Sequence, residues 1–276
     1  MGNLKNIPTF TKRERFFFLK LTAMIKKCIL WVCIFALSGS FSLFSQGQFK
    51  ALVYTSPDYY HDVVIPTAIS EFKKMAAKHF FEMEWTQQAS RFNGDELKDY
   101  AVIVFLHANG GSLDNEQMKS LKQFVRQGGG FVGIHATSVT QEQDEWFQKL
   151  VGRVFIGHPE KQTAVINVID KNFPACMHLP DHWLWTDEWY DFGEALTDSM
   201  HVLLTVDEST YNAINGMGDF HPVSWYQEYD GGRSFYTAMG HLEIHYSDAR
   251  FLDHIYGGIY WAATGKGILM NTSEDF

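Results

Sequence analysis

The sequence predicts an α/β fold with a doubly wound, mostly parallel central sheet. Short apolar runs alternate with amphipathic segments through the first half of the chain, in the order β-α-β-α-β-α. Two runs, Tyr100–His107 and Phe131–Ile134, are almost continuously apolar, as strands buried on both faces are. The sequence shows no low-complexity linker and no internal repeat, so a single domain is expected.

The first half contains four expected strands and two expected helices. Along Asp62–His79 the apolar side chains fall on one helical face, and the helix Asn115–Gln127 stops at Gly128. Gly128–Gly130 precede a strand and do not follow one, so they end a helix and do not cradle phosphate. The expected strands are Phe49–Thr55, Phe81–Thr86, Tyr100–His107 and Phe131–Ile134.

The second half is less regular. Asp230-Gly231-Gly232 is a strong hairpin signal between two expected strands, Val223–Tyr229 and Ser234–Met239. A final helix is expected over Asp248–Thr264, followed by a C-terminal tail over 266–276. Further strands are expected at Val165–Ile169 and His201–Val206.

Residues 1–46 form a separate segment with the features of a signal peptide. They hold seven basic residues and one acidic residue, followed by the apolar stretch Cys28–Phe44. The core Ile29–Leu37 has the length of a signal hydrophobic region, and we place cleavage near Ser45–Gln46 and the true start near Met24. An uncleaved N-terminal membrane anchor is the alternative, because the stretch approaches the roughly 17 residues of a short span. The remaining chain is expected to be exported, to the periplasm of a Gram-negative source.

The exported part is acidic and rich in histidine. Residues 1–46 hold seven of the 23 basic and one of the 32 acidic residues, so the remainder carries a formal charge of −15. This charge argues against a nucleic-acid partner, because phosphate backbones are bound by basic patches. Only Cys176 lies in this part, which excludes an internal disulfide, and we expect it to pack or to be a free thiol and not to act as a nucleophile. All twelve histidines lie there.

Four histidines stand at expected strand ends or in tight loops, where α/β sheets present side chains to ligands. His135 ends an apolar strand, and His241 follows the strand Ser234–Met239. His158 lies in the loop GHPE, and His221 immediately precedes a strand. A single histidine is more often a surface or core residue, but four on one rim favour a functional role, above all for His135 and His241.

Three other residue types near these histidines are functional candidates. Glu188 lies among aromatic side chains in TDEWYDF, and burial there is expected to raise its pKa and suit it to proton transfer, a role for which Asp187 competes. Trp189 is a candidate for stacking on a sugar ring. Arg233, beside the Gly-Gly turn, is a candidate clamp for substrate oxygens. The alternatives are an exposed loop acid for Glu188, core packing for Trp189 and a structural ion pair for Arg233.

The familiar catalytic and nucleotide motifs are missing from the sequence. It contains no G-x-S-x-G elbow, Walker loop, G-x-G-x-x-G fingerprint or H-E-x-x-H motif. An ester or amide hydrolase with a serine or cysteine nucleophile is therefore not favoured.

A series of segments from about Phe49 to Gly265 points to one family. They include FVRQGGGFVGIHATS, LVGRVFIGHPE, WTDEWYDF and GDFHPVSWYQEYDGGRSFYTAMGHLE. In these segments the chain resembles ThuA-like proteins of the trehalose-utilisation family. The resemblance implies a flavodoxin-like three-layer sandwich over residues 47–265, similar to class I glutamine amidotransferases. Those enzymes carry a cysteine nucleophile where this chain has His135, so the resemblance implies their fold without their reaction.

The resemblance also implies a carbohydrate-active protein that acts on a glycoside or 3-keto-sugar by hydrolysis, elimination or isomerisation, with a sugar oxidoreductase as pathway partner. A ketone acidifies neighbouring C–H bonds, so His135 or His241 is expected to be the base, with Glu188 as its partner. A divalent metal, if bound, would take those same three side chains as ligands. The substrate-binding candidates are His158, His221, Arg233 and Trp189. The alternative is a non-catalytic sugar-binding or scaffold protein, and the oligomeric state is left open.

Overall fold

The structure is a computed structural model that describes residues 47–56 and 58–267. The predicted signal peptide or anchor, with Met24, lies outside these residues, as does most of the predicted tail. The helices within the described residues are all too short or too polar to span a bilayer.

A nine-stranded sheet forms the centre of the described residues, in the order β2-β1-β3-β4-β11-β10-β9-β6-β7. The pairs from β2 to β11 are parallel, in the 2-1-3-4-5 order of flavodoxin-like folds, and the pairs from β11 to β7 are antiparallel. The predicted α/β class is confirmed, with an antiparallel extension. The strands are β1 Lys50–Tyr54, β2 Glu82–Thr86, β3 Val102–Leu106, β4 Gly130–Ile134, β6 Gln162–Val168, β7 His182–Asp187, β9 His201–Asp207, β10 His221–Tyr229 and β11 Gly232–Thr237.

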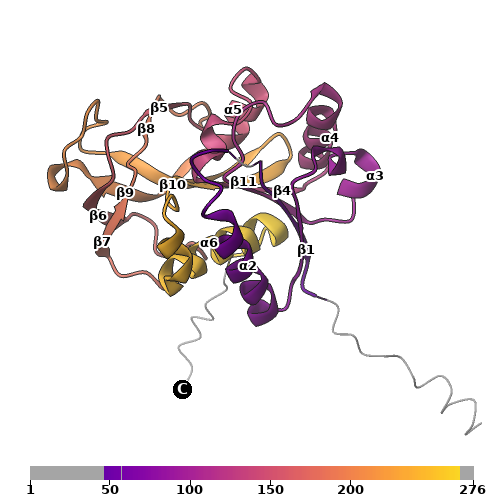
Figure 1. Cartoon of the computed structure of the whole chain (residues 1–276), viewed down its shortest axis with the longest axis horizontal. Helices are drawn as coiled ribbons and strands as arrows, with labels where there is room; N and C mark the ends of the chain where they lie inside the picture. The colour runs from indigo at the N-terminus through magenta and orange to yellow at the C-terminus, as the bar shows by residue number, and fades with distance from the viewer. Residues whose placement is uncertain (1–46, 57, 268–276) are drawn as a thin grey trace, which may run out of the picture. The chain divides into compact units, whose positions relative to one another are not determined.

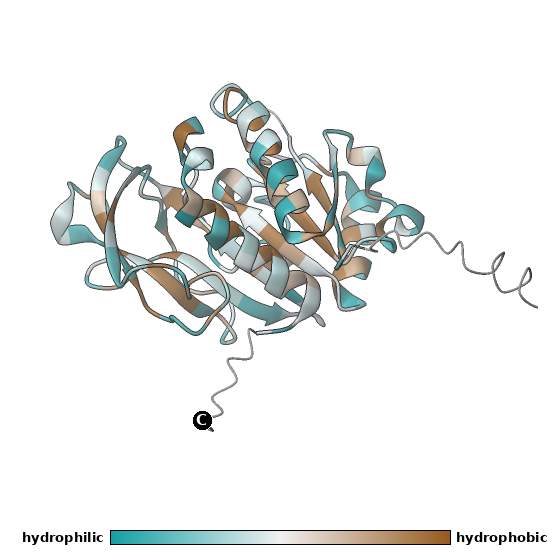
Figure 2. Ribbon diagram, turned by 90° about the horizontal axis from the view of Figure 1, so that it is seen from below, coloured by the Kyte–Doolittle hydropathy of each residue, from teal (hydrophilic) through white to brown (hydrophobic). Residues whose placement is uncertain are grey.

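Helices cover the two faces of this sheet and complete the three layers. Helices α2 (Ile65–His79) and α6 (Ala249–Thr264) lie on one face, while α4 (Asn115–Arg126) and α5 (Glu145–Val151) lie on the other (Figure 1). The central strands are largely hydrophobic, and the outward faces of the helices are hydrophilic (Figure 2). Burial of strands β3 and β4 on both faces explains their near-continuous apolar sequences.

Local signals in the sequence account for the main element boundaries. Helix α4 starts at a capping box, in which the Asp114 carboxylate accepts the backbone N–H of Gln117 and the Gln117 side chain accepts the N–H of Asp114. The hairpin between β10 and β11 turns at Asp230 and Gly231, both with positive φ, as an Asp-Gly turn requires. Cys176 is fully buried, as predicted, and burial raises the pKa of its thiol.

Five short α-helices and strands among the described residues were not predicted. Strand β7 lies at the sheet edge with a mostly exposed sequence, so its hydrophobic pattern is weak. The others are too short to show periodicity. They are α3 (Gly94–Leu97), α5, β5 (Phe155–Gly157) and β8 (Asp191–Phe192), of which the two strands pair antiparallel.

Candidate active site

Four histidines converge at the carboxyl edge of the parallel strands. His107 and His135 directly follow β3 and β4. His61 lies in the turn after β1, and His241 lies shortly beyond β11. Neighbouring imidazole rings have centroids 4.9–5.4 Å apart. Parallel strands all end at the same edge, so residues far apart in the sequence meet there. We call these four residues the histidine cluster.

The structure brings Glu188 into contact with this cluster. Its Oε2 atom lies 3.2 Å from Nδ1 of His241 and 3.5 Å from Nε2 of His135. The two ring nitrogens are themselves 3.2 Å apart. The three residues predicted to be catalytic, His135, Glu188 and His241, therefore lie in contact with one another.

The backbone and hydrogen bonds of His135 fix the direction of its ring. His135 has φ of 53°, a conformation that costs energy for a residue with a side chain and that clusters at functional sites. Its Nδ1–H donates to the Ala238 carbonyl at 2.7 Å, because a carbonyl can only accept. Its Nε2 then carries a lone pair, which accepts the Tyr190 hydroxyl at 2.8 Å.

His61 and His107 are members of the cluster that sequence reasoning missed. His107 ends the strand β3 as His135 ends β4, and it also has a positive φ, so the same strand-end signal was available. His61 lies in a turn that carries no such signal. Both carboxylate oxygens of Asp58 lie 2.9 Å from Nδ1 of His61, and Asn109 donates to the same carboxylate.

The charges in the cluster differ from the sequence-based expectation. Burial would raise the pKa of Glu188, but the facing ring of His135 and the nearby imidazoles of His241 and His158 lower it to about 2. The predicted rise of this pKa is therefore wrong, and Glu188 is a carboxylate at neutral pH. Burial and the neighbouring His135 lower the pKa of His241 to about 4, so its imidazole is neutral there.

Asp187 organises the backbone beneath the cluster and does not face it. Its buried carboxylate accepts the backbone N–H groups of Glu188, Gly240 and His241 at 2.9, 2.8 and 3.3 Å. One side chain thereby ties together the two segments that carry Glu188 and His241. Asp187 is a positioning residue.

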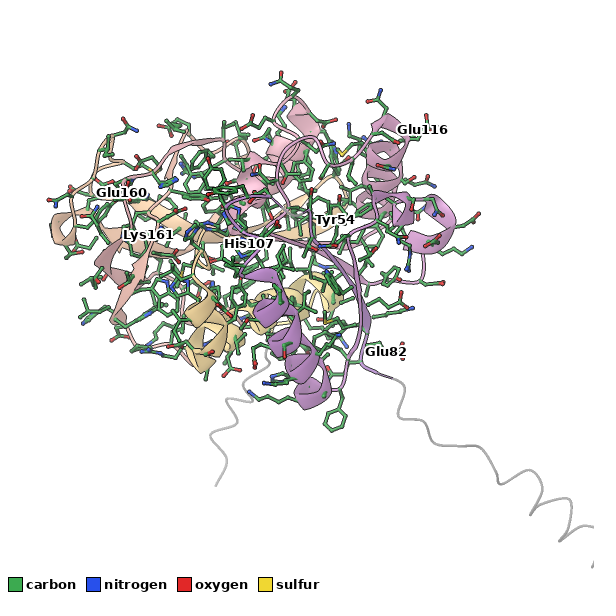
Figure 3. The ribbon with its side chains drawn as sticks, viewed as in Figure 1. Tyr54, Glu82, His107, Glu116, Glu160 and Lys161 are labelled. Carbon is green, nitrogen blue, oxygen red and sulfur yellow. The ribbon has the colours of Figure 1, made fainter. Side chains whose placement is uncertain are left out.

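His158 and Lys161 lie at the mouth of the cluster. Nε2 of His158 is 3.7 Å from Oε2 of Glu188, and Nζ of Lys161 is 4.0 Å from Oε1. The side chain of His158 is 35% exposed, whereas that of Glu188 is 10% exposed. Figure 3 labels His107 near the centre of the molecule and Lys161 to its left, just before strand β6. His158 thus connects the buried carboxylate to solvent, at the rim where it was predicted.

Two of the predicted substrate-binding residues are buried behind the site. Trp189 is buried in the core, where its Nε1–H donates to the Gln162 carbonyl, so it has no face free for a sugar ring. His221 is fully buried, and its Nε2–H donates to the Tyr190 carbonyl at 2.9 Å. His221 therefore supports the residue whose hydroxyl contacts His135, and direct substrate contact by His221 or Trp189 is wrong.

Arg233 lies at the amino end of β11, and the histidine cluster lies beyond the carboxyl ends of the strands. Its predicted role as a substrate clamp is therefore also wrong. It stands at the start of β11, whereas His241 follows the end of that strand. Its guanidinium donates to the carbonyls of Ala262 and Gly128 at 2.8 and 2.9 Å. Arg233 thus caps the carboxyl end of α6, where helix carbonyls lack partners and attract a cation.

Replacing Arg233 by methionine is expected to lower stability without changing the site. The variant leaves backbone carbonyls without a charged donor, which typically costs about 1–3 kcal/mol. We expect the free energy of unfolding in urea to fall by that amount while any turnover per folded molecule stays as in the wild type. Loss of turnover in a fully folded variant would show that Arg233 does take part in substrate binding or catalysis.

Two sets of side chains within residues 47–56 and 58–267 have the spacing of metal ligands: His61 with His135 and His241, and Asp191 with Glu208 and His221. In the first set the ligand atoms lie within 4.8 Å of one another, and Glu188, the third ligand predicted from the sequence, lies beside it with Oε2 3.2 Å from Nδ1 of His241. In the second set the Glu208 carboxylate already accepts two backbone N–H groups and faces the His221 ring at 2.7 Å. A structural hydrogen-bond network accounts for the second set.

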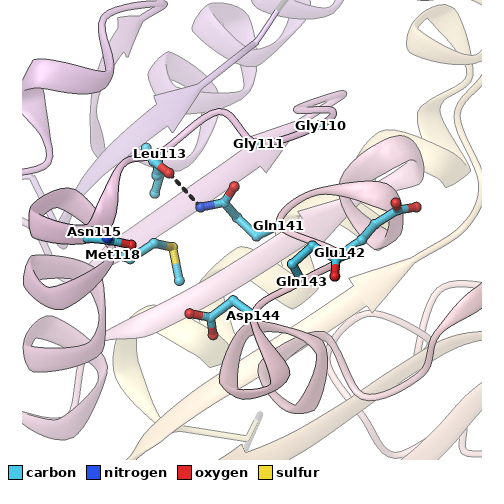
Figure 4. Close-up of a pocket in the computed structure, with 9 residues that line it drawn as sticks. All are labelled: Gly110, Gly111, Leu113, Asn115, Met118, Gln141, Glu142, Gln143 and Asp144. Atoms are coloured by element: carbon cyan, nitrogen blue, oxygen red, sulfur yellow. Dashed lines mark hydrogen bonds between the residues drawn. The ribbon is translucent and has the colours of Figure 1, made fainter.

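A cavity of about 350 Å³ lies beyond the carboxyl ends of the parallel strands, between the loops that follow β3 and β4 (Figure 4). Gln141 crosses it and donates to the Leu113 carbonyl. Its lining contains no imidazole. The histidine cluster, with its perturbed pKa values and converging nitrogens, is the better candidate for chemistry.

Comparisons with known proteins agree on one family. Residues 50–262 match the family model for ThuA, described as trehalose utilisation. A putative ThuA-like protein from Bacteroides uniformis is 23% identical, with a TM-score of 0.69 over 83% of this chain and 96% of that one. Another from Parabacteroides merdae is 22% identical, with a TM-score of 0.67 over 80% and 91%.

More distant structures resemble this chain in fold alone. PurLQS from Thermotoga maritima is 13% identical, with a TM-score of 0.50 over 76% of this chain and 97% of that one. Among curated proteins, none matches the chain significantly.

Proposed function

Because the chain belongs to the ThuA family of trehalose utilisation, we propose that it is an exported carbohydrate-active enzyme that acts on a glycoside or 3-keto-sugar. The composition of residues 1–46 supports export. The single observation that supports catalysis is the position of Glu188, a buried carboxylate within 3.2–3.7 Å of three imidazole nitrogens. Perturbed acids and bases that converge at a strand edge are typical of active sites.

The proposed reaction begins with proton abstraction beside the ketone. The Glu188 carboxylate takes the proton from the carbon next to the carbonyl, and the C–H electron pair forms an enolate. Lys161, whose Nζ lies 4.0 Å from Oε1 of Glu188, is the donor for the developing oxyanion, in the role first expected of Arg233. His158, at the mouth, exchanges the proton with solvent.

The enolate then follows one of two balanced courses. In elimination, the electron pair forms a C=C bond, the glycosidic C–O bond breaks, and the departing oxygen takes up a proton. In isomerisation, the proton returns to the same enolate on another atom. Both need a substrate that already carries a ketone, so a sugar oxidoreductase must act first, on a sugar hydroxyl.

Solvent exchange tests this function directly. The full-length chain is incubated with a 3-keto-disaccharide in D₂O, and NMR follows the hydrogen beside the ketone. We expect that hydrogen to be replaced by deuterium faster than without protein, with elimination or isomerisation products following. Unoxidised trehalose, whose C–H bonds are not acidified, serves as the control. Saturable binding without any exchange would contradict the proposal and favour the sugar-binding alternative.

A further inference from the structure

Imidazole nitrogens and one carboxylate converge in the histidine cluster. The Nδ1–H of His135 is donated to the Ala238 carbonyl, so its Nε2 carries no proton; that atom accepts the Tyr190 hydroxyl at 2.8 Å and lies 3.2 Å from Nδ1 of His241. Oε2 of Glu188 lies 3.5 Å from that nitrogen. Lone pairs that face one another in a buried site repel unless a proton or a cation lies between them.

His61 adds a third electron pair with no partner. Its Nδ1–H donates to Asp58, so Nε2 carries the lone pair. This atom is buried and makes no hydrogen bond to any described residue. The residue is only 5% exposed, and its ring packs 5.1 Å from His135 and 5.4 Å from His241 between centroids. A buried, unpaired imidazole nitrogen beside two others is costly unless it binds a ligand.

The outer hydrogen bonds match those of metal-binding histidines. A histidine that binds a metal usually donates its other N–H to a carboxylate or a backbone carbonyl, which fixes the ring and its tautomer. His61 has Asp58 in this position, and His135 has the Ala238 carbonyl. Asn109 in turn holds Asp58.

The spacing of the nitrogens also suits a small ion. Tetrahedral zinc with bonds of 2.0–2.1 Å places its ligands about 3.3–3.4 Å apart. Nε2 of His135 and Nδ1 of His241 are 3.2 Å apart, and the ligand atom of His61 lies within 4.8 Å of both. Imidazole ligands select first-row transition metals over calcium or magnesium.

We propose that His61, His135 and His241 bind one divalent transition-metal ion, best represented by Zn²⁺, with Asp58 as the outer partner of His61. Three protein ligands leave a fourth position open to water or to a substrate oxygen, as in catalytic zinc sites. Glu188 lies beside this set, with Oε2 3.2 Å from Nδ1 of His241 and 3.5 Å from Nε2 of His135. The site stands independently of the proposed function, because it rests on the cluster and not on any substrate.

A shared proton is the competing explanation. A proton on Nε2 of His135 would bond to Glu188 and relieve the repulsion between those two groups. It would leave the lone pair of His61 without a partner, since that atom is outside every hydrogen bond of the cluster. His61 therefore distinguishes the two explanations, and it is the residue to test.

Metal binding can be measured without a substrate. The untagged, full-length chain is treated with a chelator and titrated with Zn²⁺ by calorimetry, and bound metal is counted by mass spectrometry. We expect one tight site per chain. His61→Gln should weaken Zn²⁺ binding by more than 100-fold, and Asp58→Asn by about 10–100-fold, as outer-partner changes do. Co²⁺ in the same site should show the intense visible absorption of tetrahedral coordination.

The control variant is His182→Gln, which removes an exposed imidazole from β7. We expect it to bind Zn²⁺ as the wild type does. Equal weakening by His182→Gln and His61→Gln would indicate loose surface binding and overturn the site. Wild-type affinity in a folded His61→Gln variant would also overturn it, in favour of the shared proton. Failure of the sugar exchange assay with intact Zn²⁺ binding would reject the proposed function alone.

Discussion

Replacement of His135 by alanine or asparagine is expected to abolish turnover of a 3-keto-disaccharide while the fold persists. His135 contributes the Nε2 atom at the centre of the cluster, and general acid–base groups typically contribute 10²–10⁴-fold to a rate. We expect a fall in kcat of about 10³-fold, near the middle of that range, because the side chain also supports the Tyr190 hydroxyl. Steady-state kinetics with near-UV circular dichroism measure both properties.

The asparagine variant separates loss of chemistry from loss of structure. Asparagine tolerates a positive φ better than alanine does, and its amide can still donate to the Ala238 carbonyl. His178→Ala, which removes an exposed imidazole, is the matched control and should turn over normally. Wild-type turnover in folded His135 variants would remove this residue from the mechanism.

Much of the site was predictable because the sheet obeys a simple rule. Apolar strands bounded by glycine were visible in the sequence, and parallel strands deliver their next residues to one edge. That rule places His135 and His241 together, and the structure puts their ring nitrogens 3.2 Å apart. Applied to Tyr100–His107 it would also have found His107. The apolar pattern of a strand thus predicts that the residues directly after it lie at the carboxyl edge of the parallel sheet.

The remaining errors have physical causes that a linear pattern does not contain. Arg233 and His241 are close in sequence but lie at opposite ends of β11, so proximity along the chain was misleading. Trp189 and Glu188 are adjacent, yet one is turned into the core and the other toward the histidines. His61 depends on the path of a turn, which the short-range sequence does not define. The pKa of Glu188 depends on charges that only the fold brings near it.

Replacement of Glu188 by glutamine is the second large effect we expect. The change preserves shape and removes the charge, so a base is lost without creating a cavity. We expect kcat to fall by about 10²–10⁴-fold, with a smaller change in KM, because the carboxylate acts on the reacting proton. Deuterium exchange beside the ketone should fall by the same factor as turnover. An unchanged rate of exchange would assign the base to another residue.

The same variant tests the electrostatics of the cluster through His241. The Glu188 carboxylate raises the pKa of His241, opposing burial and the nearby His135, and the balance is about 4. Removing the negative charge should therefore lower this pKa further, so that His241 stays neutral to a lower pH. NMR titration of His241 in metal-free protein measures the shift. An unchanged pKa would mean that burial of the imidazole, and not the charge of Glu188, governs its proton. In that case Glu188 is not the anion that acts on His241.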